Sequence, residues 1–153
     1  MSKSPGHQKW PDHKIEEQRV DQRVTVEVDG ELIADSSDVI RLDEDRYPPR
    51  YYFPRSDVKL DKFVRSETTT QCPFKGTAHH FSLNLDRRKF QDAAWSYEDP
   101  YDEHRDLKDR LALGILSALF PDRPVVGIHA VDLVWGLGTI HCLTRQQPAV
   151  THP

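Results

Sequence analysis

The chain lacks most features that mark secreted, membrane-spanning and nucleic-acid-binding proteins. It has only two cysteines in 153 residues, too few for a secreted disulfide scaffold, and no apolar signal segment follows Met1. No run reaches the roughly 20 apolar residues that a bilayer span needs. Lysine and arginine number 21 against 25 acidic residues, and no basic block is present to neutralise a phosphate backbone. We therefore expect a cytoplasmic protein that binds neither membranes nor nucleic acid.

Signals for metals and cofactors are also missing. The chain has no glycine-rich phosphate loop before a helix and no spaced pair of acids that would hold magnesium. His79 and His80 are adjacent, so on a strand they face opposite ways and cannot bind one metal ion together. Their spacing from Cys72 fits no common zinc pattern. We expect no metal and no cofactor.

Alternating apolar residues predict a body rich in β-strands. Residues 23–28 alternate as a strand does, Asp29-Gly30 is typical of a type I′ turn, and residues 31–34 return as the second strand of a hairpin. Further strands are predicted at residues 39–42, 51–53, 78–85, 90–97, 125–128, 132–135 and 140–144. A length of 153 residues suits one domain with its own core.

One amphipathic helix is predicted after the strands. Asp102 can cap it, and its apolar residues recur every fourth position, at Leu107, Leu111, Ile115 and Leu119. The predicted class is therefore α+β, a compact and mostly antiparallel β domain, barrel-like or tent-like, with this single helix. We divide the chain into an irregular arm at 1–18, a β domain at 19–113 that includes the start of the helix, and a C-terminal segment at 114–153.

The stretch from 69 to 82 concentrates reactive side chains beside a tight turn. Lys75 precedes Gly76, and an ammonium with the amides of a glycine turn can form an anion site; the alternative is a solvated loop lysine. Cys72 is either a thiolate stabilised by Lys75 or a small buried apolar residue. Both alternatives stay open at this point.

Aromatic residues on the neighbouring strands predict a ligand pocket at this stretch. Alternation sends Tyr52 to the face opposite Tyr51 and Phe53, and Phe53 fits the core better. We predict a small-molecule ligand, anionic in character, and leave a homo-oligomer open. The candidate ligand-binding residues are Lys75, Tyr52, Arg55, Cys72, Trp95 and Thr77.

Residues 3–113 carry four groups of residues in the order and spacing of a known family. They are Pro5-Gly6-His7 with Lys9-Trp10-Pro11-Asp12-His13, Tyr47-Pro48-Pro49 with Tyr51-Tyr52-Phe53-Pro54-Arg55, Cys72-Pro73-Phe74-Lys75-Gly76-Thr77-Ala78, and Ala94-Trp95-Ser96-Tyr97-Glu98-Asp99-Pro100. The chain thereby resembles the family catalogued as domain of unknown function 427, which also carries a nucleotidyltransferase-like label. The resemblance implies a mostly β domain whose segments meet around a central pocket. It names no reaction, so whether the protein is an enzyme stays open.

Residues 120–149 resemble a different family. Ile140-His141-Cys142 and Gln146-Gln147-Pro148-Ala149 are similar to the C-terminal end of agmatine deiminase, an amidinohydrolase of the pentein fold. The resemblance implies that Cys142 stands at the nucleophile position, where a thiolate would attack a guanidinium carbon and release ammonia. Only a small terminal piece of that family is present, and its acid and base partners have no counterpart here. The alternative function is therefore a deiminase remnant that is inactive alone.

Overall fold

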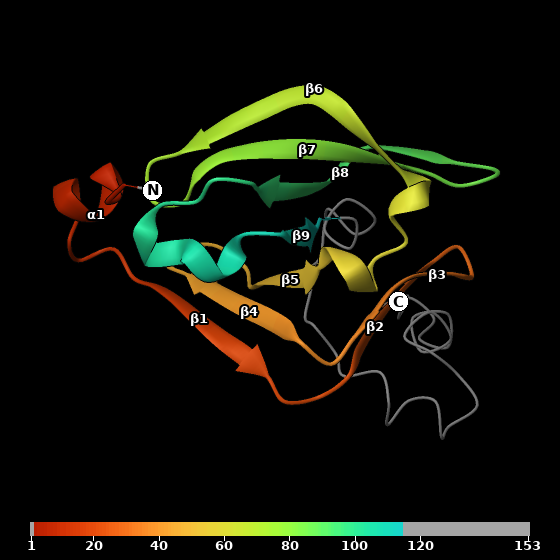
Figure 1. Cartoon of the computed structure of the whole chain (residues 1–153), viewed down its shortest axis with the longest axis horizontal. Coiled ribbons are helices and arrows are strands. Elements are labelled where there is room, and N and C mark those ends of the chain that lie inside the picture. The colour runs from red at the N-terminus through yellow and green to blue at the C-terminus, as the bar shows by residue number, and fades with distance from the viewer. Residues whose placement is uncertain (1, 115–153) are drawn as a thin grey trace, which may run out of the picture.

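The computed structural model describes residues 2–114, and these residues form an open antiparallel sheet with a separate hairpin (Figure 1). Seven strands pair in the order β1-β4-β5-β9-β8-β7-β6, and β2 pairs with β3 alone. The strands are β1 Ile15–Val20, β2 Val24–Val28, β3 Glu31–Ser36, β4 Val39–Glu44, β5 Arg50–Pro54, β6 Phe63–Cys72, β7 Gly76–Asn84, β8 Lys89–Tyr97 and β9 Arg110–Leu113. The mostly antiparallel β class is confirmed. Because β1 and β6 are the two edges of the described sheet, the barrel-like alternative is wrong for these residues.

The helices of the described part are short. They are α1 Pro5–Lys9 and the 3-10 helices η1 Arg55–Asp57, η2 Leu60–Lys62 and η3 Asp102–Leu107. The amphipathic helix predicted from Asp102 is wrong as far as Gly114, since η3 is followed by β9. No helix within residues 2–114 has the length and apolar content that a membrane crossing needs.

The helix prediction failed because β9 lies in the middle of the sheet. All four of its residues are buried, so apolar side chains occupy both faces and erase the two-residue period of a strand. Leu107 and Leu111 look like one helical stripe, yet they belong to two separate apolar clusters. Asp109 has a φ of 59°, in the left-handed region that ends a helix. Ile115, Leu119 and the strands predicted beyond residue 125 lie outside the described residues.

The first 18 residues, predicted to be irregular, instead contain α1 and most of β1. The Ser4 hydroxyl accepts a hydrogen bond from the His7 N–H at 3.1 Å and so caps α1. β1 runs antiparallel to β4, from Ile15 opposite Glu44 to Val20 opposite Val39. Between its two apolar end residues β1 is wholly polar, so apolar periodicity could not reveal it.

All of the strands predicted within the described residues are confirmed. In the hairpin of β2 and β3, Asp29 and Gly30 have φ values of 51° and 82°, as a type I′ turn requires. The predictions at 39–42, 51–53, 78–85 and 90–97 correspond to β4, β5, β7 and β8. β6 was not predicted. It is a ten-residue edge strand made largely of exposed polar residues, which carry no alternating apolar signal.

The sheet has two faces of different character. On the first, which we call the hairpin face, the residues of β2 and β3 share one buried cluster with Phe53, Leu83 and Leu111. On the second, the pocket face, a smaller cluster contains Tyr52, Tyr97 and Ala112. Adjacent residues on β5 and β9 thus enter different clusters, as the two-residue period of a strand dictates.

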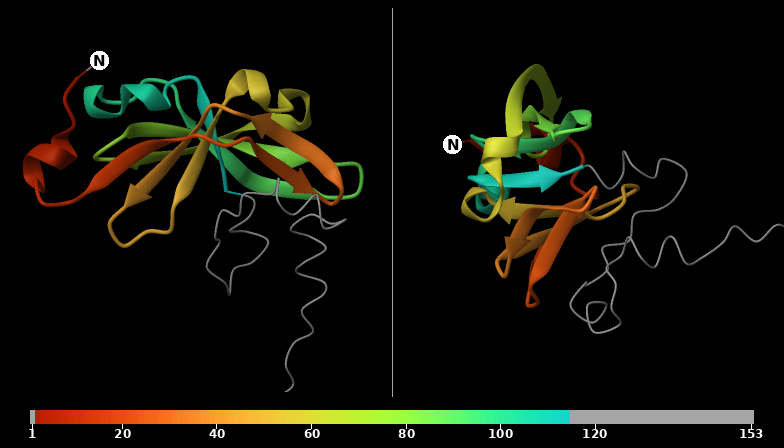
Figure 2. Two further views of the ribbon diagram at one scale, coloured as in Figure 1. Left: turned by 90° about the horizontal axis from the view of Figure 1, so that it is seen from below. Right: turned by 90° about the vertical axis from the view of Figure 1, so that its right-hand side faces the viewer.

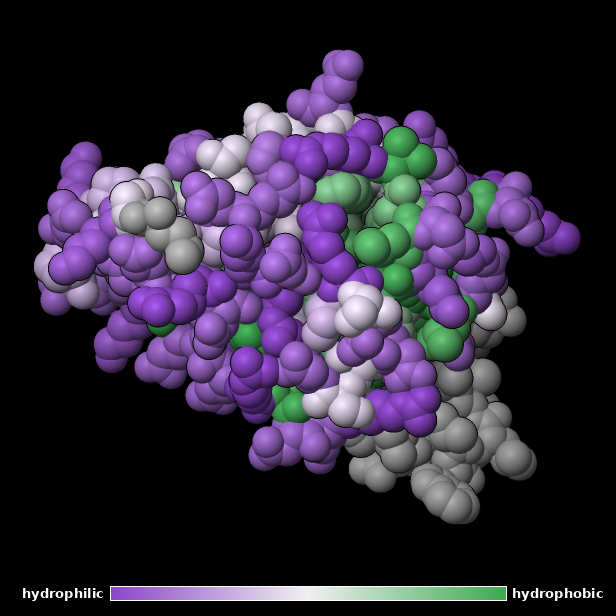
Figure 3. Space-filling view, viewed as in Figure 1, coloured by the Kyte–Doolittle hydropathy of each residue, from purple (hydrophilic) through white to green (hydrophobic). Residues whose placement is uncertain are grey.

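The sheet is strongly twisted, as the two further views show (Figure 2). The half formed by β6, β7 and β8 therefore lies at a wide angle to the half formed by β1, β4 and β5, with β9 joining them (Figure 1). The surface on the side of that view is mainly hydrophilic, with apolar residues gathered in one area (Figure 3).

Candidate functional site

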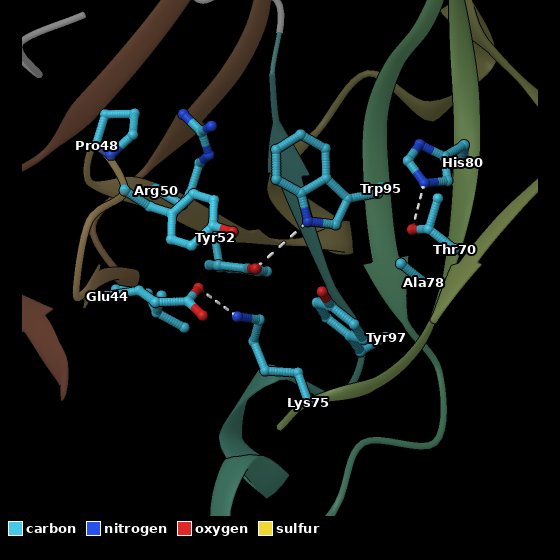
Figure 4. Close-up of a pocket in the computed structure, with 12 residues that line it drawn as sticks. Glu44, Pro48, Arg50, Tyr52, Thr70, Lys75, Ala78, His80, Trp95 and Tyr97 are labelled. Carbon is cyan, nitrogen blue, oxygen red and sulfur yellow. Dashed lines mark hydrogen bonds and ion pairs between the residues drawn. The ribbon is translucent and has the colours of Figure 1, made fainter. Parts of the chain in front are cut away.

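A pocket of about 220 Å³ lies on the pocket face between the two halves of the sheet. Its lining comes from β4 and the loop after it, from β5, and from the three strands of the other half (Figure 4). The lining residues are Leu42, Glu44, Tyr47, Pro48, Arg50, Tyr52, Thr70, Lys75, Ala78, His80, Trp95 and Tyr97. Four of these twelve are aromatic Tyr or Trp residues, and three carry a full charge.

The hollow exists because small residues separate large ones. Ala112 of β9 is the register partner of Tyr52 on one side and of Trp95 on the other. The small methyl group of Ala112 leaves room above the sheet. The side chains of Tyr52 and Trp95 meet across this space, where Trp95 Nε1 donates to Tyr52 Oη at 3.4 Å. Ala78 of β7 pairs with Tyr97 in the same way. Strand alternation therefore builds both walls from residues two apart.

An ion pair forms the floor. Lys75 is only 5% exposed, and its Nζ donates to Glu44 Oε2 at 2.6 Å. The other carboxylate oxygen, Oε1, lies 3.2 Å from His13 Nε2. The predicted solvated alternative for Lys75 is therefore wrong. The ammonium lies in the pocket, as expected for a binding residue, but its charge already has a carboxylate partner.

The two tyrosines beneath the pocket remain neutral. Burial, the largest cause, raises the pKa of Tyr52 and of Tyr97 well above the usual value. Cys72 packs against this cluster and is half-buried, and its thiol hydrogen bond adds to the raised pKa of Tyr97. Cys72 thus packs beside Tyr97 and is not among the lining residues, and both of its predicted alternatives stay predictions.

The upper walls combine an arginine with aromatic rings. The Arg50 guanidinium carbon lies 5.7 Å from the centre of the Trp95 ring, a cation–π arrangement. Tyr47 stands at the rim and is 61% exposed. On the opposite wall, His80 Nε2 lies 3.0 Å from Thr70 Oγ1, and among the described residues no group hydrogen-bonds the buried His80 Nδ1.

Of the six predicted ligand-binding residues, three line the pocket: Tyr52, Lys75 and Trp95. Arg55 does not, since it lies on the hairpin face, with its guanidinium 5.3 Å from the Phe81 ring and 3.4 Å from Glu98 Oε1. Thr77 is exposed and donates to Gln71 Oε1 at 2.6 Å. Arg55 comes directly after the end of β5 and begins η1, so the strand alternation that carries Tyr52 into the pocket does not extend to it.

The two histidines of β7 diverge as predicted. His79 Nδ1 accepts a hydrogen bond from Arg65 at 2.7 Å, whereas His80 lines the pocket. In the range 2–114, no three metal-ligating side chains gather into a group that could hold an ion.

Several polar lining residues were not among the predicted candidates, and Arg50, Glu44 and Tyr47 are the most informative of them. Arg50 shares a strand and a face with Tyr52, so strand parity could have found it. Glu44 follows Leu42 by two residues, but the predicted strand ended at residue 42. Tyr47 belongs to the Tyr-Pro-Pro motif, whose place at the rim has no signal in local periodicity.

Within the predicted arm at 1–18, residues 4–13 hold the turn that carries Lys75, and from here on the arm means residues 4–13. The Gly6 N–H donates to the Pro73 carbonyl at 2.8 Å, and the Ser4 hydroxyl donates to the same oxygen at 3.0 Å. A β-carbon on Gly6 would lie 2.7 Å from that oxygen, so only glycine fits. The Phe74 ring contacts three aromatic side chains of the arm, those of His7, Trp10 and His13.

A second polar network fastens the arm to η3. His7 Nε2 lies 3.0 Å from His104 Nε2, and His104 Nδ1 lies 2.5 Å from Glu17 Oε1. The ring centres are 5.2 Å apart and the ring planes are 30° from parallel, so the two nitrogens lie within hydrogen-bond distance, with the donor set by the tautomers. Burial, and next the neighbouring His104, lower the pKa of His7.

Comparison with known families gives two matches. The family described as domain of unknown function (DUF427) matches residues 16–117, which is 102 of the 153 residues. The family described as Porphyromonas-type peptidyl-arginine deiminase matches residues 100–148. Both resemblances found in the sequence are therefore confirmed, and the pocket lies within the first match.

Curated relatives match only a short part of the chain. A protein of Lactococcus lactis assigned as an agmatine deiminase is 48% identical over 46 residues, 30% of this chain and 13% of the relative. Similarly assigned proteins of Enterococcus faecalis and Streptococcus mutans are 44% identical over 46 residues and 45% identical over 47 residues. The chain thus spans 13% of the length of these relatives.

Proposed function

This chain belongs to the DUF427 family, and from that premise we propose that its domain binds a small planar ligand with one negative charge in the pocket face. The observation that carries the proposal is the composition of the pocket, which has aromatic walls, Arg50 stacked on Trp95 and an internally matched ion pair below. Small-molecule sites are concave and combine aromatic or apolar walls with a number of placed polar groups.

The shape of the walls favours a planar ligand. Trp95 and Tyr52 meet over Ala112, and Tyr47 covers the rim with most of its ring exposed. Aromatic rings offer large rigid surfaces on which another flat group stacks, with a gain of about 0.5–1.5 kcal/mol per pair beyond burial. A volume of about 220 Å³ suits a single ring system with a short substituent.

The charges of the lining favour a single negative charge. The fully ionised lining residues Glu44, Lys75 and Arg50 sum to one positive charge, and Arg50 is the cation that lies over the Trp95 ring. A guanidinium holds a carboxylate or phosphate through paired N–H groups. The prediction of an anionic ligand is therefore retained, with Arg50 instead of Arg55 as the cation nearest the ligand.

Benzoate and benzamide test this proposal, because they share a ring and differ by one charge. We expect benzoate to bind more tightly than benzamide in ligand-observed NMR titrations and to raise the melting temperature. Arg50→Gln should remove the preference for benzoate, and Trp95→Ala should weaken both ligands. Arg41→Gln, which changes an exposed arginine paired with Asp43, is the matched control. Equal affinities for the two ligands in the unaltered protein contradict the proposal.

A second candidate is the hydrolysis of agmatine at Cys142, as the deiminase-like match at residues 100–148 suggests. The relatives that bear this assignment are about eight times longer than the matched segment, so the segment holds a small part of their structure. Our proposal is that this segment is inactive alone. Ammonia release from agmatine that disappears in Cys142→Ser would show instead that the segment is an active deiminase.

A further inference from the structure

The Glu44 carboxylate in the pocket floor is shared between two side chains that can both be cations. Its Oε2 accepts from Lys75 Nζ at 2.6 Å, and its Oε1 lies 3.2 Å from His13 Nε2. The side chains of Lys75 and Glu44 are 6% and 14% exposed, and that of His13 is 22% exposed. His13 therefore connects the floor of the pocket with the solvent outside the arm.

The charge of the floor depends on whether His13 carries a proton. With a neutral imidazole, the floor holds one ammonium and one carboxylate and has no net charge. With an imidazolium, two cations share one carboxylate, and the floor gains one positive charge. Lys75 lines the pocket and His13 does not. A ligand in the pocket therefore interacts with the extra positive charge at Lys75. Histidine is the side chain whose charge ordinarily changes between about pH 5 and pH 8.

The surroundings of His13 are compatible with the charged form. Its ring stacks on Phe74, with centres 4.5 Å apart and planes 22° from parallel, a geometry in which an imidazolium gains from the ring electrons. The charged and titratable groups that face His13 are Glu44 from β4, Lys75 from the turn after β6 and His7 from α1. Asp45, next to Glu44, accepts from the Lys14 N–H at 2.9 Å.

We propose that His13 determines the charge specificity of the pocket, because its proton offsets Glu44 and leaves the charge of Lys75 to an anionic ligand. This inference rests on the proposed function, since it concerns the same pocket. It also explains why the arm is fastened to the Lys75 turn by two hydrogen bonds to the Pro73 carbonyl and by three aromatic contacts to Phe74. The arm is then a part of the binding site.

Titration calorimetry with benzoate at about pH 5.5 and about pH 8 tests the inference, because benzoate is an anion at both values. We expect roughly tenfold tighter binding at the lower pH and the uptake of a proton, seen as a dependence of the binding heat on the buffer. His13→Gln keeps a hydrogen-bond donor to Glu44 but cannot take the proton, so its affinity should be equal at the two pH values. A pH dependence that persists in His13→Gln overturns the inference.

A measurement without ligand separates this inference from the proposed function. Acetylation of Lys75 by an N-hydroxysuccinimide ester, followed by peptide mass spectrometry relative to the exposed Lys89, reports how firmly Glu44 holds Lys75. At about pH 6, His13→Ala and His13→Gln should both lower the relative rate several-fold, because neither residue can carry the proton that offsets Glu44. Trp10→Ala, which loosens the arm at a residue that Glu44 does not contact, is the control. An unchanged rate in His13→Ala overturns the coupling, whereas absent benzoate binding with a lowered rate removes only the proposed ligand.

Discussion

The two faces of the sheet are built from the same strands and differ in almost every physical property. The hairpin face is closed by β2 and β3, and its cluster is almost entirely aliphatic and aromatic. The pocket face has two buried tyrosine hydroxyls, an ion pair and a hollow that β2 and β3 do not cover. Neighbouring residues along β5, β8 and β9 point to opposite faces. We therefore expect the hairpin face to carry most of the stability of the domain, and we place the proposed site on the pocket face.

The largest expected effect is on the hairpin face. Leu111 is fully buried, and Leu111→Ala should lower the free energy of unfolding by about 2–5 kcal/mol, because it removes buried methyl groups and leaves a cavity. Urea unfolding followed by circular dichroism measures it. Leu60→Ala, at a residue 40% exposed, should change stability by less than about 0.5 kcal/mol. Similar losses for the two variants would contradict the division of roles.

The next effect concerns the ion pair in the floor. Lys75→Met should lower the free energy of unfolding by about 2–3 kcal/mol. Breaking a fully buried ion pair costs about 3–5 kcal/mol, and the loss should be smaller here because the pocket admits water. The double variant with Glu44→Gln should lose less than the sum of the single variants, since it leaves no unpaired buried charge. Additive losses in a urea double-mutant cycle would mean that the pair is not coupled and that the pocket face contributes to stability in another way.

The same comparison explains how far the sequence alone predicts the structure. On the hairpin face, alternation at Val26 and Val28 and the Asp29-Gly30 turn identify β2 and β3, because local propensity and burial agree there. β9 was predicted as a helix because burial on both sides removes its period, and β6 was missed because a polar edge strand has no apolar period. For the pocket, strand alternation separates Tyr52 from Phe53, and Tyr52 is among the lining residues. The Lys75–Glu44 pair joins residues 31 apart, a distance that local patterns cannot resolve.

A smaller effect is expected from pH. Burial lowers the pKa of His7 in the folded protein below its ordinary value of 6.5, so the unfolded chain binds more protons than the folded one just below that pH. Stability should therefore be independent of this group above about pH 7.5 and should decrease as the pH falls through 6.5 toward the folded value. His7→Gln should remove this part of the decrease in urea unfolding at a series of pH values.

Glu103 provides the control for this pH effect. Burial opposes the shift, but the N–H groups of its own backbone and of Ser4 outweigh it and lower the pKa of the Glu103 carboxyl. Its contribution should consequently be lost only at more acidic pH, below the ordinary value of 4.5. A decrease between about pH 7 and pH 6 that is the same in His7→Gln as in the unaltered protein would exclude His7 as its source.

The smallest effect on stability should come from Tyr47, and it sharpens the comparison most. Tyr47 lines the pocket yet is 61% exposed, so Tyr47→Ala should change the free energy of unfolding by less than about 0.5 kcal/mol. Loss of a stacking partner should weaken benzoate binding several-fold. Val64→Ala, at an exposed residue of the edge strand β6, should leave both quantities unchanged. If Tyr47→Ala lowered stability as much as binding, the rim would belong to the core, and the pocket face would share the role assigned here to the hairpin face.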